Sequence, residues 1–113
     1  MDLQEKAIRL KIYVGESDQY GGLPAYKAVV HYLRERGIWG ATVTKGVYGY
    51  GKKSLLHATN PLRLSTDLPV VIDAVDSERK IQSVLPKVRE IARDGLITLD
   101  EVTVVSMISS DER

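Results

Sequence analysis

The chain has 113 residues, with 16 Lys plus Arg against 15 Asp plus Glu, and neither Cys nor Phe. Hydrophobic residues make up 43% and charged residues 27%, ordinary globular usage that excludes wholesale disorder. The length predicts a single domain over residues 1–113. The lack of cysteine excludes disulfides, thiolate catalysis and cysteine-based zinc sites. No apolar stretch approaches the roughly 20 residues that cross a bilayer, so we expect a cytoplasmic protein with no direct membrane insertion.

The net charge of +1 conceals an uneven distribution of charge. No acidic residue occurs between Glu35 and Asp67, whereas five basic residues lie in that span: Arg36, Lys45, Lys52, Lys53 and Arg63. The middle of the chain therefore has a local positive field, which favours an anionic ligand. The alternative is that these bases are solvated surface charges.

The first half of the chain predicts a strand, a helix and a strand. Residues 7–14 alternate between polar side chains and an apolar set formed by Ile8, Leu10, Ile12 and Val14. A polar turn over 15–22 precedes a helix that begins near Pro24 and stops at Gly37. Its apolar stripe consists of Tyr26, Val29, Val30 and Leu33. A second strand is predicted over 38–48.

The second half repeats this order after a long loop at 46–60. A strand is predicted over 62–76, with Pro69 at its start or at an edge position. Ser77 is expected to cap a helix that Gly95 ends. Pro86 should either kink this helix or lie near its first turns. Its apolar stripe consists of Ile81, Val84, Leu85, Val88, Ile91 and Ala92. A last strand over 102–108 closes a core of 7–108, before a polar tail at 109–113.

The predicted fold class is α+β, a ferredoxin-like split βαβ sandwich of order β-α-β-β-α-β over a mixed sheet. In this arrangement the second and third strands are antiparallel neighbours, which two to five residues would connect. The predicted connection of about 15 residues contains Lys52, Lys53 and His57. An oversized loop on a compact domain indicates a functional segment.

The glycine-rich start of this loop resembles a phosphate-binding motif, because Gly46, Gly51 and Lys52 match G-x-x-x-x-G-K. The next residue is Lys53 instead of Ser or Thr, and no helical pattern follows, so a Walker A loop is excluded. What remains is a set of backbone amides that can approach an anion beside two lysines. The alternative is a flexible hairpin tip.

No catalytic or metal-binding constellation emerges from the remaining polar residues. His31 and His57 have no carboxylate pattern that would make a metal site or a triad. Glu16 and Asp18 form one acidic pair, and Asp100-Glu101 form another, but acids are common in turns and receive no catalytic role.

Several blocks of the sequence closely resemble the PII-like proteins of domain-of-unknown-function family 190. The blocks, which together cover about 8–107, are Lys11-Ile12-Tyr13-Val14-Gly15-Glu16-Ser17-Asp18, Gly40-Ala41-Thr42-Val43, Gly49-Tyr50-Gly51, Asp67-Leu68-Pro69-Val70-Val71-Ile72 and Gly95-Leu96-Ile97-Thr98-Leu99. The resemblance implies a ferredoxin-like homotrimer that binds adenine nucleotides in clefts between subunits. It also implies that the long loop engages a partner protein, such as a membrane transporter or an enzyme.

The resemblance also implies where the ligand lies. Gly40, Thr42 and Val43 would lie near the base, with the root of the loop at the phosphates, formed by Gly49, Tyr50, Gly51, Lys52 and Lys53. Arg63 joins this set through the basic span, and a neighbouring subunit would supply Gly95, Leu96 and Thr98. Residues 93–98 lack the lysine of the PII phosphate loop, so AMP or another small anion fits as well as ADP or ATP.

These observations favour a non-enzymatic regulator that binds an adenine nucleotide and signals through the 46–60 loop. No cofactor beyond that ligand is required. The alternative is a small enzyme with a site shared between subunits, hydrolysing a phosphate ester or anhydride through Glu16 or His57. RNA binding is a third class, because RNA-recognition domains share this topology. No nucleic-acid partner is expected, since the strands lack the aromatic pair on which such domains stack bases.

Overall fold

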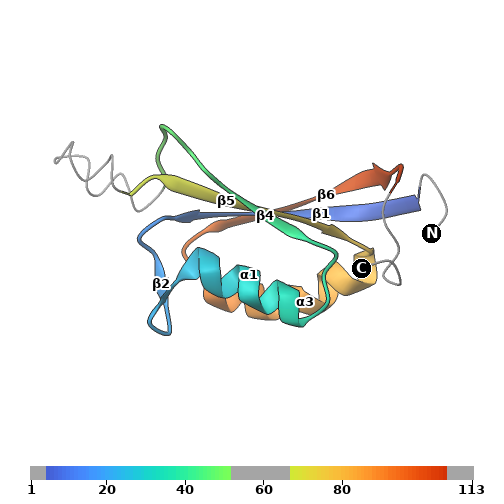
Figure 1. Cartoon of the computed structure of the whole chain (residues 1–113), viewed down its shortest axis with the longest axis horizontal. Helices are drawn as coiled ribbons and strands as arrows, with labels where there is room; N and C mark the ends of the chain where they lie inside the picture. The colour runs from blue at the N-terminus through green and yellow to red at the C-terminus, as the bar shows by residue number, and fades with distance from the viewer. Residues whose placement is uncertain (1–4, 52–66, 107–113) are drawn as a thin grey trace.

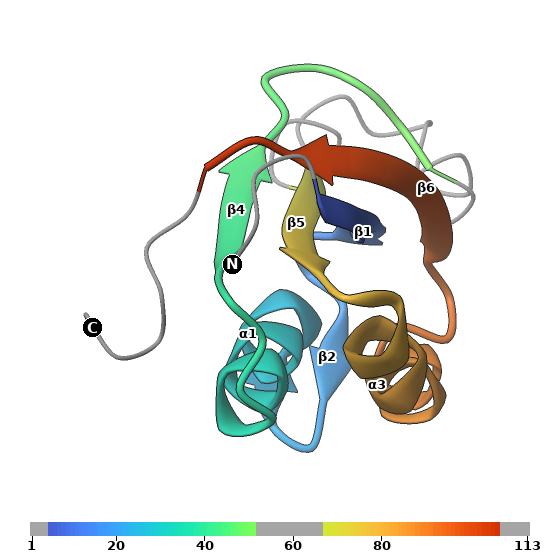
Figure 2. The same ribbon diagram turned by 90° about the vertical axis from the view of Figure 1, so that its right-hand side faces the viewer.

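The computed structural model describes residues 5–51 and 67–106 as a four-stranded sheet with two helices on one face (Figure 1). The strands are β1 (Glu5–Gly15), β4 (Ala41–Lys45), β5 (Pro69–Asp76) and β6 (Leu96–Val104), in the spatial order β4-β5-β1-β6. The helices are α1 (Ala25–Glu35) and α3 (Glu78–Ile91), and an end-on view shows them as a layer below the sheet (Figure 2).

This order confirms the predicted ferredoxin-like arrangement, with β4 and β5 as antiparallel neighbours at one side of the sheet. The prediction of a mixed sheet was wrong, because every strand pair that the structure describes in this sheet is antiparallel. The two crossovers explain the difference. Each joins parallel strands that are not neighbours, since β5 lies between β1 and β4, and β1 lies between β5 and β6.

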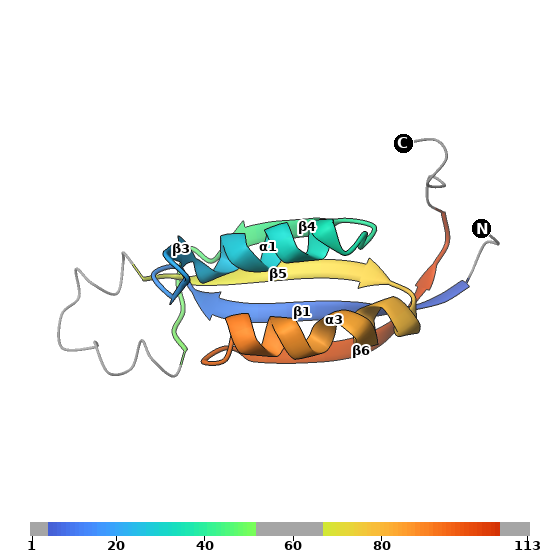
Figure 3. The same ribbon diagram turned by 90° about the horizontal axis from the view of Figure 1, so that it is seen from below.

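The core lies between the sheet and the helices, which run side by side beneath it (Figure 3). The alternation predicted for β1 is confirmed: Leu10, Ile12 and Val14 are buried, and Ile8 packs against the same cluster. β5 contributes Val70, Ile72 and Ala74 to this face. The other sheet face has no helix over it in the described part of the chain, and its β5 side chains are only half-buried.

Helix α1 begins after Pro24 and ends in a Schellman motif. Gly37, with a φ of 74°, donates its N–H to the Arg34 carbonyl at 3.1 Å. The N–H of Ile38 reaches the Leu33 carbonyl at 3.1 Å, and both of these apolar side chains are buried. Gly37 therefore stops the helix, as predicted.

Helix α3 also begins as predicted, because the Ser77 hydroxyl accepts the N–H of Lys80 at 3.3 Å. The buried side chains of this helix are Ile81, Val84, Val88 and Ile91. Pro86 lies in the interior of the helix and not in its first turns. The helix ends at Ile91, and a short turn that includes Gly95 leads into β6.

Several elements differ from the prediction, among them the end of α3, which stops at Ile91 before Gly95. The turn expected over 15–22 contains a small hairpin, β2 (Gln19–Tyr20) and β3 (Leu23–Pro24), whose tip glycines Gly21 and Gly22 have φ angles of 55° and 82°. β6 begins at Leu96, six residues before the expected start. The sequence did not indicate its first half, because this edge strand is exposed on both faces and shows little alternation.

The connection between β4 and β5 is longer than expected. β4 covers only 41–45 of the predicted 38–48, and β5 begins at Pro69, so Pro69 starts an interior strand and does not lie at an edge. Residues 46–51 and 67–68 of the connection are described, whereas the predicted strand residues 62–66 lie outside the described part. The described roots of the loop meet at one end of the sheet (Figure 1).

Candidate functional site

A cavity of about 420 Å³ lies where the loop root meets the ends of β1 and β6. It is lined by Tyr13, Val14, Gly15, Asp18, Tyr50, Gly51, Asp67, Pro69, Asp94, Gly95 and Leu96. These residues come from four separate parts of the sequence. We call this cavity the root pocket.

The turn after β1 forms one wall of the root pocket and is held by two carboxylates. Asp18 Oδ2 accepts the N–H of Gly15 at 3.0 Å. Asp67 Oδ1 accepts both the N–H and the hydroxyl of Ser17, at 3.1 and 2.8 Å. A Cβ at position 15 would lie 2.9 Å from Asp67 Oδ1 and 3.2 Å from Asp18 Oδ1, so a larger residue would require the Asp67 carboxylate to shift.

The same turn holds both roots of the long loop. At the far root, the N–H of Glu16 donates to the Leu68 carbonyl at 3.0 Å. At the near root, the Glu16 carboxylate pairs with the Lys45 ammonium at 2.8 Å, and the N–H of Gly46 donates to the Pro69 carbonyl at 2.7 Å. The pocket wall and the loop roots are therefore one connected structure.

Gly95 brings the start of β6 against the end of β1. A Cβ there would collide with the carbonyl oxygen of Tyr13 and would lie 2.9 Å from Val14 Cγ1. The Gly95 N–H donates to the Ala92 carbonyl at 2.8 Å, which closes the turn after α3. Leu96 follows opposite Tyr13 in the β1–β6 register and has 59% of its surface exposed.

The structure brings four of the predicted ligand residues together, namely Tyr50, Gly51, Gly95 and Leu96, which all line the root pocket. The resemblance placed the last two in a neighbouring subunit. Within one chain they lie beside the loop root, because β6 pairs with β1, whose end lies beside that root, and their place in a neighbouring subunit's site stays a prediction. Gly49 lies next to this group, since a Cβ added to it would lie 3.2 Å from Pro69 Cγ.

The other predicted residues are not brought to the root pocket. Thr42 lies on the uncovered sheet face opposite Asp73, and Gly40 and Thr42 line a separate depression with Trp39. Val43 is 38% exposed on β4, and Thr98 is exposed on β6. Lys52, Lys53 and Arg63 lie outside the described residues.

The root pocket also contains residues that the prediction missed, and they change its charge. Asp18, Asp67 and Asp94 line it, and none of its described lining residues is Lys, Arg or His. Tyr13 was predictable as a side chain on the polar side of the first strand. Asp67 and Asp94, which lie far from Tyr13 in the sequence, were not predictable, because their place depends on the register of β1 with β5 and β6.

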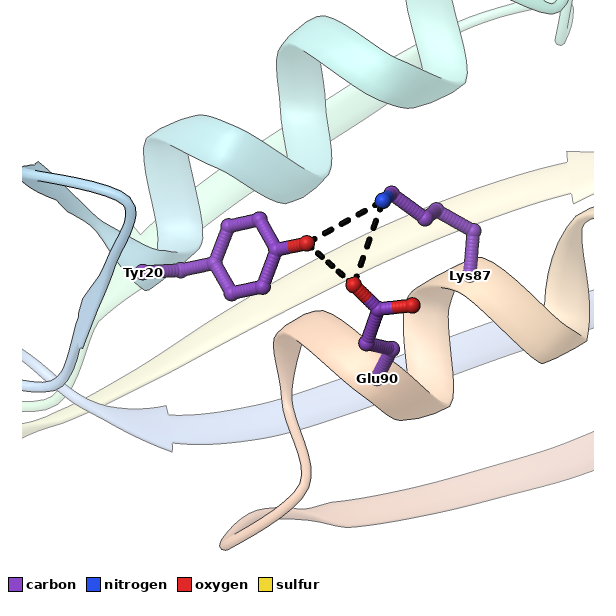
Figure 4. A network of polar contacts seen from close by, with 3 residues as sticks. All are labelled: Tyr20, Lys87 and Glu90. Carbon is purple, nitrogen blue, oxygen red and sulfur yellow. Dashed lines mark hydrogen bonds and ion pairs between the residues drawn. The ribbon is translucent and has the colours of Figure 1, made fainter.

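Beside the root pocket, a polar network fastens the β2–β3 hairpin to α3 (Figure 4). The Tyr20 hydroxyl donates to Glu90 Oε2, and the Lys87 ammonium donates to Tyr20 at 3.1 Å and to Glu90 at 3.2 Å. The Lys87 ammonium also lies 5.5 Å from the centre of the Tyr20 ring. The Tyr20 and Lys87 hydrogen bonds lower the pKa of Glu90, and those to Tyr20 and Glu90 raise the pKa of Lys87.

The side chains considered for catalysis do not converge in the described part of the chain. Glu16 is held by Lys45, His31 is exposed on α1, and His57 lies outside the described residues. Among residues 5–51 and 67–106, no three His, Asp or Glu side chains are placed to hold a metal ion. Within the same ranges, neither helix has the length and apolar character needed to cross a membrane.

Comparison with known sequences identifies relatives over most of the chain. A family profile described as Uncharacterized ACR, DUF190, matches residues 7–104. A UPF0166 protein of Methanocaldococcus jannaschii is 43% identical over 100 residues, covering 88% of this chain and 92% of the relative. A UPF0166 protein of Aquifex aeolicus is 36% identical over 96 residues, covering 85% of this chain and 90% of the relative.

Comparison with solved structures identifies the same fold in CPII of Thiomonas intermedia K12, a nitrogen regulatory PII-like protein. CPII bound to ADP, AMP and bicarbonate matches with a TM-score of 0.64 and 16% identity, covering 90% of this chain and 91% of the other. CPII bound to ADP, AMP and acetate matches with a TM-score of 0.60 and 20% identity, with 92% of each chain covered.

Proposed function

This chain belongs to the DUF190 family and has a PII-like fold, and from these two facts we propose that it is a regulatory protein that binds an adenine nucleotide. The observation that carries the proposal is the root pocket, in which the described root of the long loop meets the ends of two core strands. A ligand there contacts the loop root and the core together. Structures of CPII with ADP and AMP support the choice of ligand class.

The proposal includes a homotrimer, with the nucleotide in clefts between subunits. The uncovered face of the sheet supports it, because this face has half-buried Tyr13, Val71 and Val75 beside Thr42 and Thr44, with the charged Lys11 and Asp73 in the same depression. A depression of about 430 Å³ crosses this face. A sheet face with apolar side chains is stabilised when another layer, here a second copy of the chain, covers it.

The proposal also assigns the signal to the 46–60 loop. Ligand phosphate would neutralise the neighbourhood of Lys52 and Lys53, which directly follow Gly51 in the sequence, and would favour one arrangement of the loop. That arrangement would be presented to a partner protein. Val47 and Tyr48 support this role, because these two neighbouring side chains are 93% and 94% exposed and together offer apolar surface to a partner.

Isothermal titration calorimetry of the purified protein against AMP, ADP and ATP tests the proposal. We expect binding of at least one of them. The Lys52→Ala variant should bind that nucleotide at least about tenfold more weakly, since a hydrogen bond to a charged group contributes about 1.5–3 kcal/mol. Lys27→Ala on the exposed side of α1 is the control and should leave affinity unchanged. Absence of heat with all three nucleotides would refute nucleotide binding.

Light scattering during gel filtration tests the assembly, with an expected mass of three 12.6 kDa chains. A monomer would refute the clefts between subunits. The same samples, assayed for release of phosphate from each nucleotide, separate a regulator from the alternative phosphate-ester or anhydride hydrolase. Turnover that is lost in a His57→Ala variant would favour the enzyme.

A further inference from the structure

A row of polar side chains crosses the uncovered face of the sheet, the face without helices in Figure 2. Lys11 on β1 lies opposite Asp73 on β5, which in turn lies opposite Thr42 on β4. These three residues line the depression of about 430 Å³ on this face. Thr98 on β6 lies opposite Lys11, so the row has one residue on each strand. Its positive charge therefore lies towards the β6 edge and its negative charge towards the β4 edge.

The two charges of this row are not paired within the described part of the chain. Lys11 and Asp73 are cross-strand neighbours and both are half-buried, yet no salt bridge joins them, and the Lys11 ammonium makes no hydrogen bond or ion pair there. The next charged pair on the same face is joined, because Arg9 donates two hydrogen bonds to the Asp100 carboxylate, at 3.2 and 3.0 Å.

Arg9 does not take the place of a partner for Asp73. The hydrogen bonds and charge of Asp100 raise the pKa of Arg9 most, and the nearby charge of Asp73 raises it further. Both hydrogen bonds of the Arg9 side chain end on Asp100, however, and a carboxylate has about four acceptor positions. Asp73 therefore keeps acceptor positions for a cation outside its own chain.

A second copy of the chain on this face would remove water from both charges of the row. A buried charge without a partner strongly opposes association, whereas a well-placed pair with additional hydrogen bonds does not. The hydroxyls of Thr42 and Thr44, which line the same depression, can donate such hydrogen bonds to the Asp73 carboxylate. A face with one ammonium and one carboxylate is complementary to a copy of itself.

The direction of the row also suits a ring of copies. Asp73 lies towards the β4 edge and Lys11 towards the β6 edge, at opposite sides of the sheet. Copies that meet head to tail therefore bring unlike charges together at every contact, which is the kind of contact that a closed ring contains.

We propose that Lys11 of one copy pairs with Asp73 of the next copy, and that this ion pair aligns neighbouring subunits. The proposal rests on the homotrimer proposed above and names a contact that closes it. A trimer would contain three such pairs. Tyr13 and Val71, which are half-buried in the same depression, would exclude water from them.

Charge reversal followed by light scattering during gel filtration tests the pair. We expect the wild type at the mass of three 12.6 kDa chains, and both Lys11→Glu and Asp73→Lys at the mass of one, because each places like charges at all three contacts. Lys27→Glu and Glu35→Lys make the same changes in net charge at exposed positions of α1, and these controls should remain trimeric.

Mixing the two reversed variants separates a contact between copies from a contact within one chain. In a mixed trimer two of the three contacts join opposite charges, so the mixture should contain trimers although neither variant forms them alone. A pair within one chain would gain nothing from mixing, because each chain keeps its own like charges. The chain that combines Lys11→Glu with Asp73→Lys should form trimers by itself.

A neutral variant keeps the test decisive if circular dichroism shows that a reversed variant does not fold. Lys11→Gln leaves Asp73 of the next copy without its cation. Removing one partner of a buried charge pair costs at least about 2 kcal/mol, so the protein concentration at half-assembly should rise at least about thirtyfold.

The outcomes separate this proposal from the homotrimer itself. A monomeric wild type overturns both. A trimeric wild type whose two reversed variants also remain trimeric overturns the ion pair alone, as does an unchanged half-assembly concentration in Lys11→Gln. Reversed variants that are monomeric both alone and when mixed overturn the contact between copies.

Discussion

Replacing Gly95 with alanine should destabilise the protein strongly, because no room exists for the added methyl group. The new Cβ would collide with the Tyr13 carbonyl and would lie 2.9 Å from Val14 Cγ1 and 3.3 Å from the Ala92 carbonyl. Two of these three atoms belong to the backbone and cannot rotate away. The Tyr13 carbonyl lies on β1, which pairs with both β5 and β6.

The magnitude follows from the cost of forcing extra volume into packed structure, about 1–3 kcal/mol. The backbone clash places Gly95→Ala near the upper end. With about 4 °C of melting temperature per kcal/mol for a domain of this size, we expect a decrease of roughly 8–12 °C. Gly40→Ala is a matched control, because a Cβ there has no neighbour within 4 Å and the substitution has the same effect on the unfolded chain.

Thermal unfolding followed by circular dichroism, at one protein concentration for all variants, measures the difference. Gly40→Ala should melt at or slightly above the wild-type temperature. If Gly95→Ala melts within 2 °C of Gly40→Ala, the approach of β6 to the Tyr13 carbonyl is not rigid. The root pocket, which both strands line, would then lack the fixed shape on which the nucleotide proposal depends.

Two further predictions concern polar groups that do not line the root pocket. Asp76 is 2% exposed and accepts the N–H groups of Trp39 and Ser77, so Asp76→Asn should lower the free energy of unfolding by about 1–3 kcal/mol in urea denaturation, because a buried N–H would face an amide donor. Tyr20→Phe should raise the pKa of Glu90 towards 4.5 in a carboxyl NMR titration. The network's contribution to stability is present above about pH 4.5 in the wild type and is lost as pH falls through the lowered folded pKa.

The elements that the sequence predicted well are those whose pattern records burial directly. The alternation in β1 and the stripe of α3 correspond to side chains that face one core, and Ser77 and Gly37 mark helix ends through local chemistry. These signals depend only on near neighbours in the chain. The order of strands followed from the rules of chain connection.

The elements that were missed lack such a signal. β6 is exposed on both faces over much of its length, so its first half shows no alternation. The β2–β3 hairpin has strands of two residues, and only the Gly21-Gly22 pair, typical of a two-residue hairpin turn, indicated it.

The root pocket could not be predicted as a unit, because its parts meet through strand register. Tyr13 reaches Leu96 through the β1–β6 register, and Gly15 reaches Pro69 through the β1–β5 register. A shift of one residue in either pairing would turn these side chains to the opposite face. The aspartates of the described lining come together through that register, whereas Lys52, Lys53 and Arg63 of the basic span lie outside the described residues.

The turn at 15–18 limits how a ligand can influence the long loop. Backbone hydrogen bonds fix Glu16 to Leu68 and Gly46 to Pro69, so the two roots are held at a constant separation. The Lys45–Glu16 ion pair is partly exposed, and pairs of this kind contribute at most about 1 kcal/mol. Of the described contacts between this turn and the loop roots, the Lys45–Glu16 ion pair is therefore the one that a ligand displaces most easily. Changes that begin in this pocket should first release Lys45 and should leave the strand ends in place.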